Sequence, residues 1–144
     1  MTWGGGGKPL PRIRVVGWMQ AMTDSTTATP RVLVVEDEYL IRMLLGDMLA
    51  DLGYDIAGAV GTIAEASELA AKAEFNVAIL DVNLDGQQIF PVADILAKRG
   101  LPFVFVTGYG EHSLPEPYRG RPALQKPFQA EQLKTTLAGL LASA

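Results

Sequence analysis

The chain lacks cysteine entirely, so disulfide bonds, zinc–thiolate sites and thiol chemistry are excluded. It also lacks a long apolar run, because no stretch approaches the roughly 20 residues that a membrane-spanning helix needs. The apolar stretch Val15–Met19 near the N-terminus is too short for the apolar core of a signal peptide. We therefore expect a cytoplasmic protein with no membrane contact.

Positive charge is scarce in most of the chain. The net charge is −4, and from Arg31 onward there are 9 basic and 15 acidic side chains. Nonspecific nucleic-acid binding relies on Lys and Arg to neutralise phosphates, so this balance argues against a nucleic-acid partner. It suits a domain that gathers carboxylates around a cation. With 144 residues, 49% of them hydrophobic, the chain has the size and apolar content of one globular domain.

The first 30 residues differ from the rest. They hold the glycine run Gly4–Gly7, two nearby prolines, a Ser/Thr-rich stretch at 23–30 and both tryptophans. This composition predicts a flexible N-terminal tail at 1–30, with a docking segment as the alternative, followed by one domain at 31–144.

Short apolar runs alternate with helical patterns after Pro30. The pattern predicts strands at 32–35, 56–60, 77–81, 103–107 and 123–125, and helices near 40–52, 62–74, 89–98 and 131–141. A loop is expected at 83–86. Between Glu111 and Pro122, three prolines and Gly120 predict a helix that is short, distorted or absent. Alternating strands and helices predict an α/β fold with a doubly wound, five-stranded parallel sheet.

Polar side chains follow several of these strands. Strand one ends at Glu36-Asp37-Glu38, strand three at Asp81, strand four at Thr107 and strand five at Lys126. In a doubly wound sheet the ligand crevice lies beyond the carboxyl ends of the strands. Carboxylates from two strand ends, a hydroxyl and an ammonium are therefore expected at one edge.

These residue types suit phosphoryl transfer. Asp37 and Asp81 can hold Mg²⁺, with the backbone carbonyl of Asn83 as a further ligand. A free oxygen of Asp81 can attack phosphorus and form an aspartyl phosphate. Lys126 and Thr107 would then neutralise and hydrogen-bond the phosphoryl oxygens.

The sequence resembles the response-regulator receiver family of two-component signalling. The resemblance rests on Val32–Glu38, Asp81–Leu84, Thr107-Gly108 and Lys126–Phe128, in order and at the expected strand ends. It implies a flavodoxin-like fold with strand order 2-1-3-4-5 and a cis peptide bond before Pro127. The matching positions imply that Asp81 is the phosphoacceptor, that Asp37 is a direct Mg²⁺ ligand and that Glu36 binds the ion through water. They also imply that Thr107 is the switch residue and that Lys126 is the lysine typical of the family's site.

Three positions depart from the family pattern. Ala123 stands where an aromatic switch residue is usual, and Asp85-Gly86 replaces the usual proline after the phosphoacceptor. The stretch Pro102–Gly110 resembles alphaproteobacterial single-domain receivers with a Phe-Ala-Thr-Gly motif followed by an aromatic, although Val106 replaces the alanine. Tyr109 is therefore the candidate switch aromatic; a tyrosine covering apolar surface is the plainer alternative.

Three functions remain open from the sequence. The first is a stand-alone receiver that takes a phosphoryl group from a sensor histidine kinase or histidine phosphotransferase and signals to a downstream protein or a phosphorelay. It would catalyse only its own phosphorylation and dephosphorylation. The second is a phosphatase with an aspartate nucleophile. Such enzymes have a second acid two residues after the nucleophile, and the amide Asn83 at that position argues against this function. The third is a phosphorylation-independent interaction module on the same fold.

Overall fold

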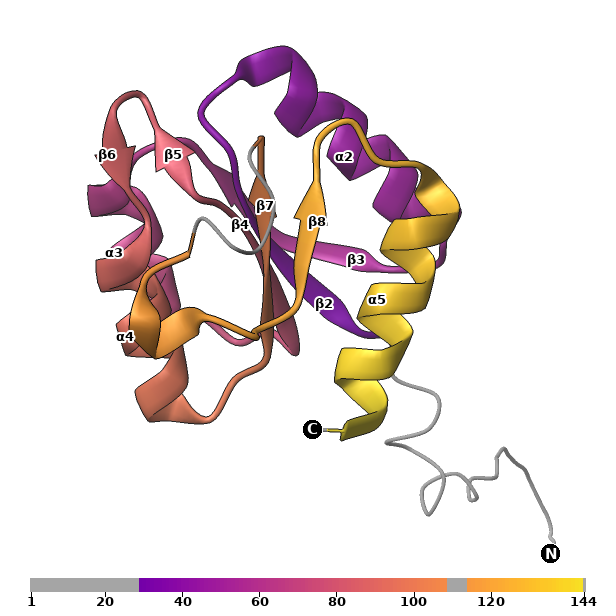
Figure 1. Cartoon of the computed structure of the whole chain (residues 1–144). Helices are drawn as coiled ribbons and strands as arrows, with labels where there is room; N and C mark the ends of the chain where they lie inside the picture. The colour runs from indigo at the N-terminus through magenta and orange to yellow at the C-terminus, as the bar shows by residue number, and fades with distance from the viewer. Residues whose placement is uncertain (1–28, 109–113, 144) are drawn as a thin grey trace, which may run out of the picture.

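The fold is a central parallel sheet with helices on both faces (Figure 1). The computed structural model describes residues 29–108 and 114–143. Its five main strands are β2 (Arg31–Val35), β3 (Asp55–Val60), β4 (Val77–Asp81), β7 (Phe103–Thr107) and β8 (Ala123–Gln125). They pair in parallel in the order β3-β2-β4-β7-β8, which confirms the predicted 2-1-3-4-5 topology.

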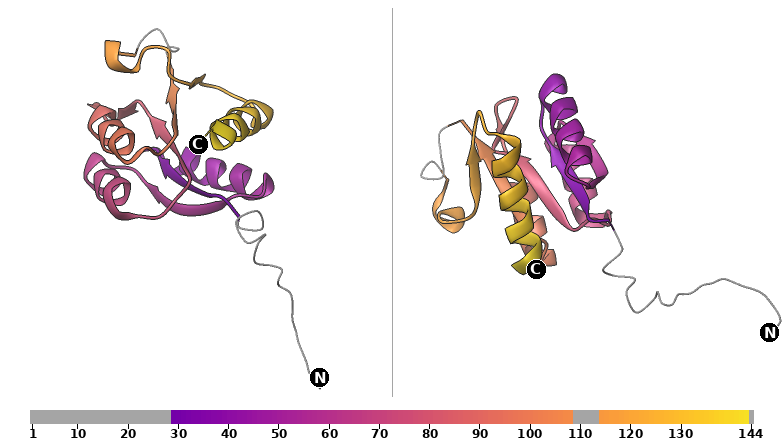
Figure 2. Two further views of the ribbon diagram at one scale, coloured as in Figure 1. Left: turned by 90° about the horizontal axis from the view of Figure 1, so that it is seen from below. Right: turned by 90° about the vertical axis from the view of Figure 1, so that its right-hand side faces the viewer.

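Two helices cover each face of the sheet, as the end-on view in Figure 2 shows. Helices α2 (Tyr39–Asp51) and α5 (Ala130–Ser143) lie on one face, and α3 (Ile63–Lys72) and α4 (Phe90–Arg99) on the other. Thr62 caps α3 as predicted, since its hydroxyl oxygen accepts the N–H of Glu65 at 3.1 Å. Gly100 ends α4 in the left-handed conformation.

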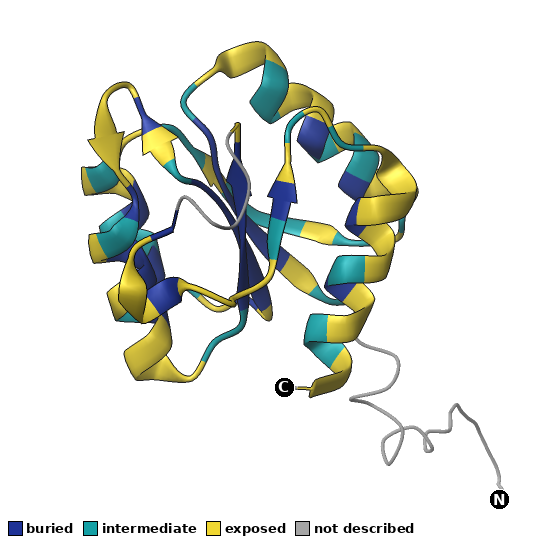
Figure 3. Ribbon diagram, viewed as in Figure 1, coloured by how far each residue is buried: buried dark blue, intermediate teal, exposed yellow. Residues whose placement is uncertain are grey.

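The central strands β2, β4 and β7 are almost entirely buried because helices cover both faces of the sheet (Figure 3). Successive side chains of a strand point to opposite faces. Leu33 of β2 accordingly packs in the core under α3 and α4, whereas its neighbour Val34 packs in the core under α2 and α5. The same alternation holds for Phe105 and Val106 in β7. This two-sided burial fixes the register of the sheet and so the position of every strand end.

Two segments after the strands are irregular. The loop predicted at 83–86 is instead a short antiparallel hairpin of β5 (Asn83–Leu84) and β6 (Gln87–Gln88). The reduced fourth helix is confirmed for the described residues, since 114–122 contain only a three-residue 3₁₀ helix, η3 (Glu116–Tyr118). The predicted cis peptide bond Lys126–Pro127 is present.

Within the described ranges, no helix combines the length and the apolar character that crossing a bilayer requires.

Candidate functional site

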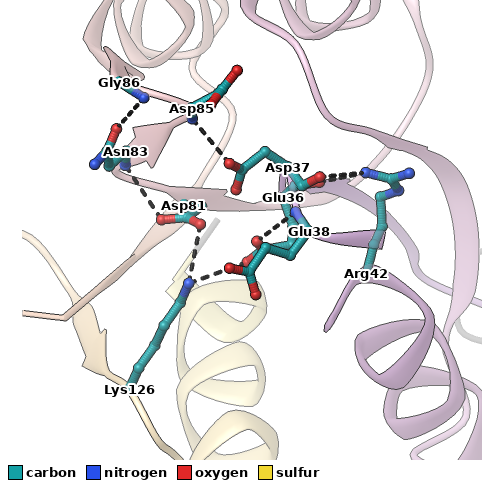
Figure 4. Close-up of polar contacts among 9 residues, drawn as sticks. All are labelled: Glu36, Asp37, Glu38, Arg42, Asp81, Asn83, Asp85, Gly86 and Lys126. Atoms are coloured by element: carbon teal, nitrogen blue, oxygen red, sulfur yellow. Dashed lines mark hydrogen bonds and ion pairs between the residues drawn. The ribbon is translucent and has the colours of Figure 1, made fainter. Parts of the chain in front are cut away.

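The predicted site residues meet at the carboxyl edge of the sheet. Asp81 is the last residue of β4, Thr107 is the last of β7, and Lys126 follows β8 directly. Glu36 and Asp37 follow β2, and Figure 4 shows their side chains beside those of Asp81 and Lys126. Residues from four different strands are thus brought together by the strand order alone.

Three carboxylates form an acidic cluster in this site. One oxygen each of Glu36, Asp37 and Asp81 lie within 4.8 Å of one another. Glu36 and Asp81 are buried, with 1% and 6% of their surface exposed, and Asp37 is half-buried. Like charges at this distance in a poorly solvated site repel strongly unless a cation or proton intervenes. A set of carboxylate oxygens is what Mg²⁺ binds, so the cluster fits a magnesium ion.

Lys126 contributes a positive charge that bridges Asp81 and Glu36. Its ammonium nitrogen lies 3.1 Å from Oδ2 of Asp81 and 3.4 Å from Oε1 of Glu36. Burial acts to lower the pKa of Lys126, but the hydrogen bond and charge of Asp81 and the charge of Glu36 outweigh it, and the pKa is raised. The Lys126 side chain is therefore protonated and positively charged at neutral pH.

Burial raises the pKa of Glu36 to about 7, with the negative charge of Asp81 adding to the effect. The N–H of Glu38, which donates to Oε2 of Glu36 at 3.0 Å, and the charge of Lys126 act in the opposite direction. Without a cation, Glu36 thus carries a proton for much of the time near neutrality.

This pKa predicts how the stability of the metal-free protein depends on pH. The pKa of Glu36 is 4.5 ordinarily and about 7 when folded, so the folded state binds the proton more tightly. The resulting stabilisation is complete below pH 4.5 and is lost as the pH rises through 7. In EDTA, the free energy of unfolding by urea is expected to fall by on the order of 1–3 kcal/mol between pH 5.5 and 8.

In a Glu36→Gln variant, the free energy of unfolding should decrease much less between pH 5.5 and 8, because the amide does not titrate. The chain has one histidine, so a His112→Gln variant removes the other side chain that ordinarily titrates in this range. An unchanged pH dependence in Glu36→Gln would show that the pKa of Glu36 is not raised.

Backbone N–H groups of the β5–β6 hairpin donate hydrogen bonds to the acidic cluster. The N–H of Asp85 donates to Oδ2 of Asp37 at 2.9 Å, and the N–H of Asn83 donates to Oδ1 of Asp81 at 3.2 Å (Figure 4). Asp85 and Gly86 both have positive φ, at 50° and 86°, and the N–H of Gly86 donates to Oδ1 of Asn83. An Asp-Gly pair is the usual signature of such a tight hairpin turn, so the sequence carried the signal for it.

A pocket of about 230 Å³ opens beside Asp81 and Thr107. Its volume is several times the ~30 Å³ that one water molecule occupies in the liquid, so a phosphoryl group has room there. Thr107 is buried, and its carbonyl accepts the N–H of Lys126 at 2.9 Å, which ties the ends of β7 and β8 together. The pocket is lined by Asp81, Val82, Asn83, Gly86, Gln88, Thr107 and Gly108.

The candidate switch aromatic, Tyr109, lies outside the described residues. A different tyrosine, Tyr118 in η3, is buried in the same apolar cluster that Ala123 packs against. Its ring stacks on Phe90, and its hydroxyl donates to a carboxylate oxygen of Asp94. Burial, together with Asp94, raises the pKa of Tyr118 to about 12. The sequence alone did not single out this residue.

Comparison with known proteins agrees with this geometry. Residues 32–138 match the response regulator receiver domain family. The chain belongs to the response regulator receiver family. Among solved structures, the receiver is similar to SdrG from Sphingomonas melonis Fr1, with 44% identity and a TM-score of 0.70 over 80% of this chain and 98% of that one. The receiver domain of PhyR from Erythrobacter litoralis matches at 35% identity and a TM-score of 0.69, over 81% and 93% of the two chains. The likeness to SdrG and PhyR agrees with the predicted alphaproteobacterial type of receiver.

The receiver is also similar to longer regulators. It is 40% identical to the transcriptional regulatory protein PdtaR of Mycobacterium tuberculosis over 77% of this chain and 57% of PdtaR. It is 33% identical to the phyllosphere-induced regulator PhyR of Methylorubrum extorquens over 76% of this chain and 43% of PhyR. The chain therefore spans about half the length of these relatives.

Proposed function

We propose that this receiver accepts a phosphoryl group on Asp81 from a phosphohistidine of a sensor histidine kinase or histidine phosphotransferase, with Mg²⁺ bound by the acidic cluster. The phosphorylated form then signals to a partner protein or returns the group to a phosphorelay. One observation carries the proposal: a buried Asp81 lies 3.1 Å from an ammonium and close to two further carboxylates, and it lines a pocket that Thr107 also lines.

The proposed step is a displacement at phosphorus. An oxygen of Asp81 forms a bond to phosphorus while the bond from phosphorus to the donor's imidazole nitrogen breaks, and that nitrogen keeps the electron pair. Bound Mg²⁺ supplies positive charge to the phosphoryl oxygens. Lys126 is already placed beside Asp81 to offset charge on the other side. Water later hydrolyses the acyl phosphate, so the only covalent chemistry proposed for the protein is on its own Asp81.

The conformational switch follows from the new charge in the pocket. The phosphoryl oxygens are proposed to accept hydrogen bonds from the Thr107 hydroxyl and the Lys126 ammonium. Hydrogen bonds to charged groups contribute about 1.5–3 kcal/mol each. Moving a two-state equilibrium from 1:99 to 99:1 takes roughly 5.5 kcal/mol. Because Lys126 already donates to Asp81, its bond to the phosphoryl group is partly an exchange, and these two bonds supply part of that energy. We propose that the change is relayed through the segment from Thr107 to Tyr109.

An apolar surface beside the site supports docking of a helical phosphodonor. Tyr39, Leu40, Met43 and Leu44 on the first half of α2 are between 48% and 71% exposed. Next to them, an apolar pocket of about 260 Å³ lies between α2 and Pro127-Phe128 and reaches Glu36 and Lys126. Exposed apolar surface of this kind is typical of protein–protein contacts. A donor helix bound there would bring a histidine to the edge of the acidic cluster.

Protein partners are the proposed output. The similar PhyR of Bartonella quintana is described as an anti-anti-sigma factor and PdtaR as a transcriptional regulatory protein. Those descriptions belong to the relatives; for this chain we propose only that a protein partner recognises the phosphorylated state.

The proposed function is tested by incubating the protein with acetyl phosphate and Mg²⁺. Intact mass is expected to show one added phosphoryl group, which hydroxylamine removes because it cleaves acyl phosphates. EDTA should prevent the addition, because the acidic cluster then lacks its cation. Failure to gain the group from acetyl phosphate and from a purified phosphohistidine donor, or a gained group that resists hydroxylamine, would overturn the proposal.

A further inference from the structure

Arg42 is bound to the backbone of the acidic cluster. It lies on α2, and its Nη1 donates to the carbonyl oxygen of Glu36 at 2.7 Å, with the carbonyl oxygen of Asp37 at 3.5 Å (Figure 4). Its guanidinium also lies over the ring of Tyr39, 5.6 Å from the ring centre. The backbone carbonyls and the ring of Tyr39 thus fix a long, otherwise mobile side chain in one position.

We propose that Arg42 is a positioning residue for the magnesium site: it fixes the backbone of Glu36 and Asp37 so that their carboxylates converge with that of Asp81. The proposal rests on the proposed function, in which these carboxylates hold the cation. Within residues 29–108 and 114–143, the guanidinium makes no ion pair with a carboxylate. Its action on the site therefore passes through the backbone carbonyls.

The turn after β2 needs such a contact. The N–H of Glu36 still belongs to the sheet, since it donates to the carbonyl of Val60 at 2.9 Å, but its carbonyl has left the strand ladder. A part-buried carbonyl without a partner is costly, and a charged donor makes a stronger bond than a neutral one. In Figure 4 Arg42 lies on the side of the Glu36–Asp37 pair away from Asp81 and Lys126. It can therefore hold the pair without competing for the cation or the phosphoryl group.

Gly61 supplies a second, independent observation. A Cβ atom at this position would lie 2.7 Å from Nη1 of Arg42 and 3.3 Å from both Cα of Asp37 and the carbonyl oxygen of Glu36. Any larger residue would displace the guanidinium and crowd the turn. The connection between β3 and α3 is thus shaped to leave room for the arginine and for the backbone that it holds.

The contacts place Asp37 between two supports. The N–H of Asp85 donates to its carboxylate from the hairpin, and Arg42 approaches its carbonyl from α2. Of the two hydrogen bonds to Asp37 within residues 29–108 and 114–143, the one from Asp85 would remain without the arginine. Partners that orient metal ligands from outside the ligand set typically account for 10–100-fold in metal affinity.

The test measures Mg²⁺ binding by isothermal titration calorimetry in the full chain and four variants. Arg42→Ala is expected to weaken binding about tenfold, toward the low end of that range because Asp85 still holds Asp37. Arg42→Lys should recover part of the loss, since an ammonium can donate to the carbonyl of Glu36 but lacks the planar guanidinium that lies over the ring of Tyr39. Gly61→Ala should weaken binding in the same direction. Gly46→Ala is the control, because a Cβ there meets nothing within 4 Å.

A second readout needs no metal. Amide hydrogen exchange at Glu36 and Glu38 in EDTA is expected to accelerate in Arg42→Ala and in Gly61→Ala but not in Gly46→Ala. Wild-type Mg²⁺ affinity and wild-type exchange in Arg42→Ala and Gly61→Ala would overturn the positioning role. If the wild-type chain itself binds no Mg²⁺ and accepts no phosphoryl group, the proposed function fails instead, and the exchange rates still decide whether Arg42 orders the turn.

Discussion

The Asp81→Asn variant is expected to gain no phosphoryl group from acetyl phosphate or from a phosphohistidine donor. The amide has nearly the same shape as the carboxylate, but it lacks the anionic oxygen that attacks phosphorus. Its oxygen can still accept the N–H of Asn83, and the substitution removes one negative charge from the acidic cluster, so the fold is expected to persist. Intact mass after incubation with the donor measures the loss, and thermal unfolding checks the fold.

Asp85→Asn is the matched control for this loss. Asp85 is an exposed acid close to the same site, but it holds Asp37 through its backbone N–H and not through its side chain. The control variant should therefore be phosphorylated like the wild type. Phosphorylation of Asp81→Asn at the wild-type level would remove Asp81 from the mechanism and direct the search to Asp37.

The position of the site could be predicted from the sequence because it depends on the ends of buried strands. Apolar runs such as Val32–Val35 end sharply in acids, and a parallel sheet brings all such ends to one edge. Strand order then decides which residues become neighbours. β2 and β4 are adjacent, so Asp37 and Asp81 meet, and β8 lies beyond β7, so Lys126 reaches Asp81 only through its long side chain.

The contacts that hold the site could not be predicted in the same way. Arg42 has the sequence context of a solvated arginine on a helix, and only the folded turn brings the carbonyl of Glu36 within 2.7 Å of it. The bond from the N–H of Asp85 to Asp37 joins residues 48 positions apart and depends on a hairpin only four paired residues long. Such contacts follow from tertiary placement and leave no periodic pattern.

The sequence predicted only in part which aromatic residue compensates for the small side chain of Ala123. Ala123 stands where related receivers usually have an aromatic switch residue, and the sequence motif indicated Tyr109 as the aromatic side chain that replaces it. Within the described residues, the tyrosine in the cluster that Ala123 packs against is Tyr118, from the segment with reduced helix, and it lies there among phenylalanine rings. A helix in that segment would have been stabilised by its own backbone bonds. Here the chain between Leu114 and Pro122 has only a few backbone hydrogen bonds of its own, so buried side chains such as Leu114 and Tyr118 contribute to holding it.

The Tyr118→Ala variant is accordingly expected to lose about 3–5 kcal/mol of unfolding free energy, the usual cost of removing a buried aromatic ring. Tyr118 is 6% exposed, and its ring lies 5.4–6.1 Å from the ring centres of Phe90, Phe103 and Phe105. Truncation leaves a cavity that these rigid rings cannot close. Urea unfolding measures the loss.

The Tyr118→Phe variant separates the ring from the hydroxyl. It keeps the aromatic contacts and removes only the bond to Asp94, whose side chain is exposed and can be solvated by water. Its expected cost is about 0.5–1.5 kcal/mol, the net value of one hydrogen bond. Equal losses in the two variants would mean that the ring of Tyr118 contributes nothing beyond its bond to Asp94. A much larger loss in the alanine variant means that the ring itself anchors residues 114–122 to the sheet, through Phe103 and Phe105 of β7.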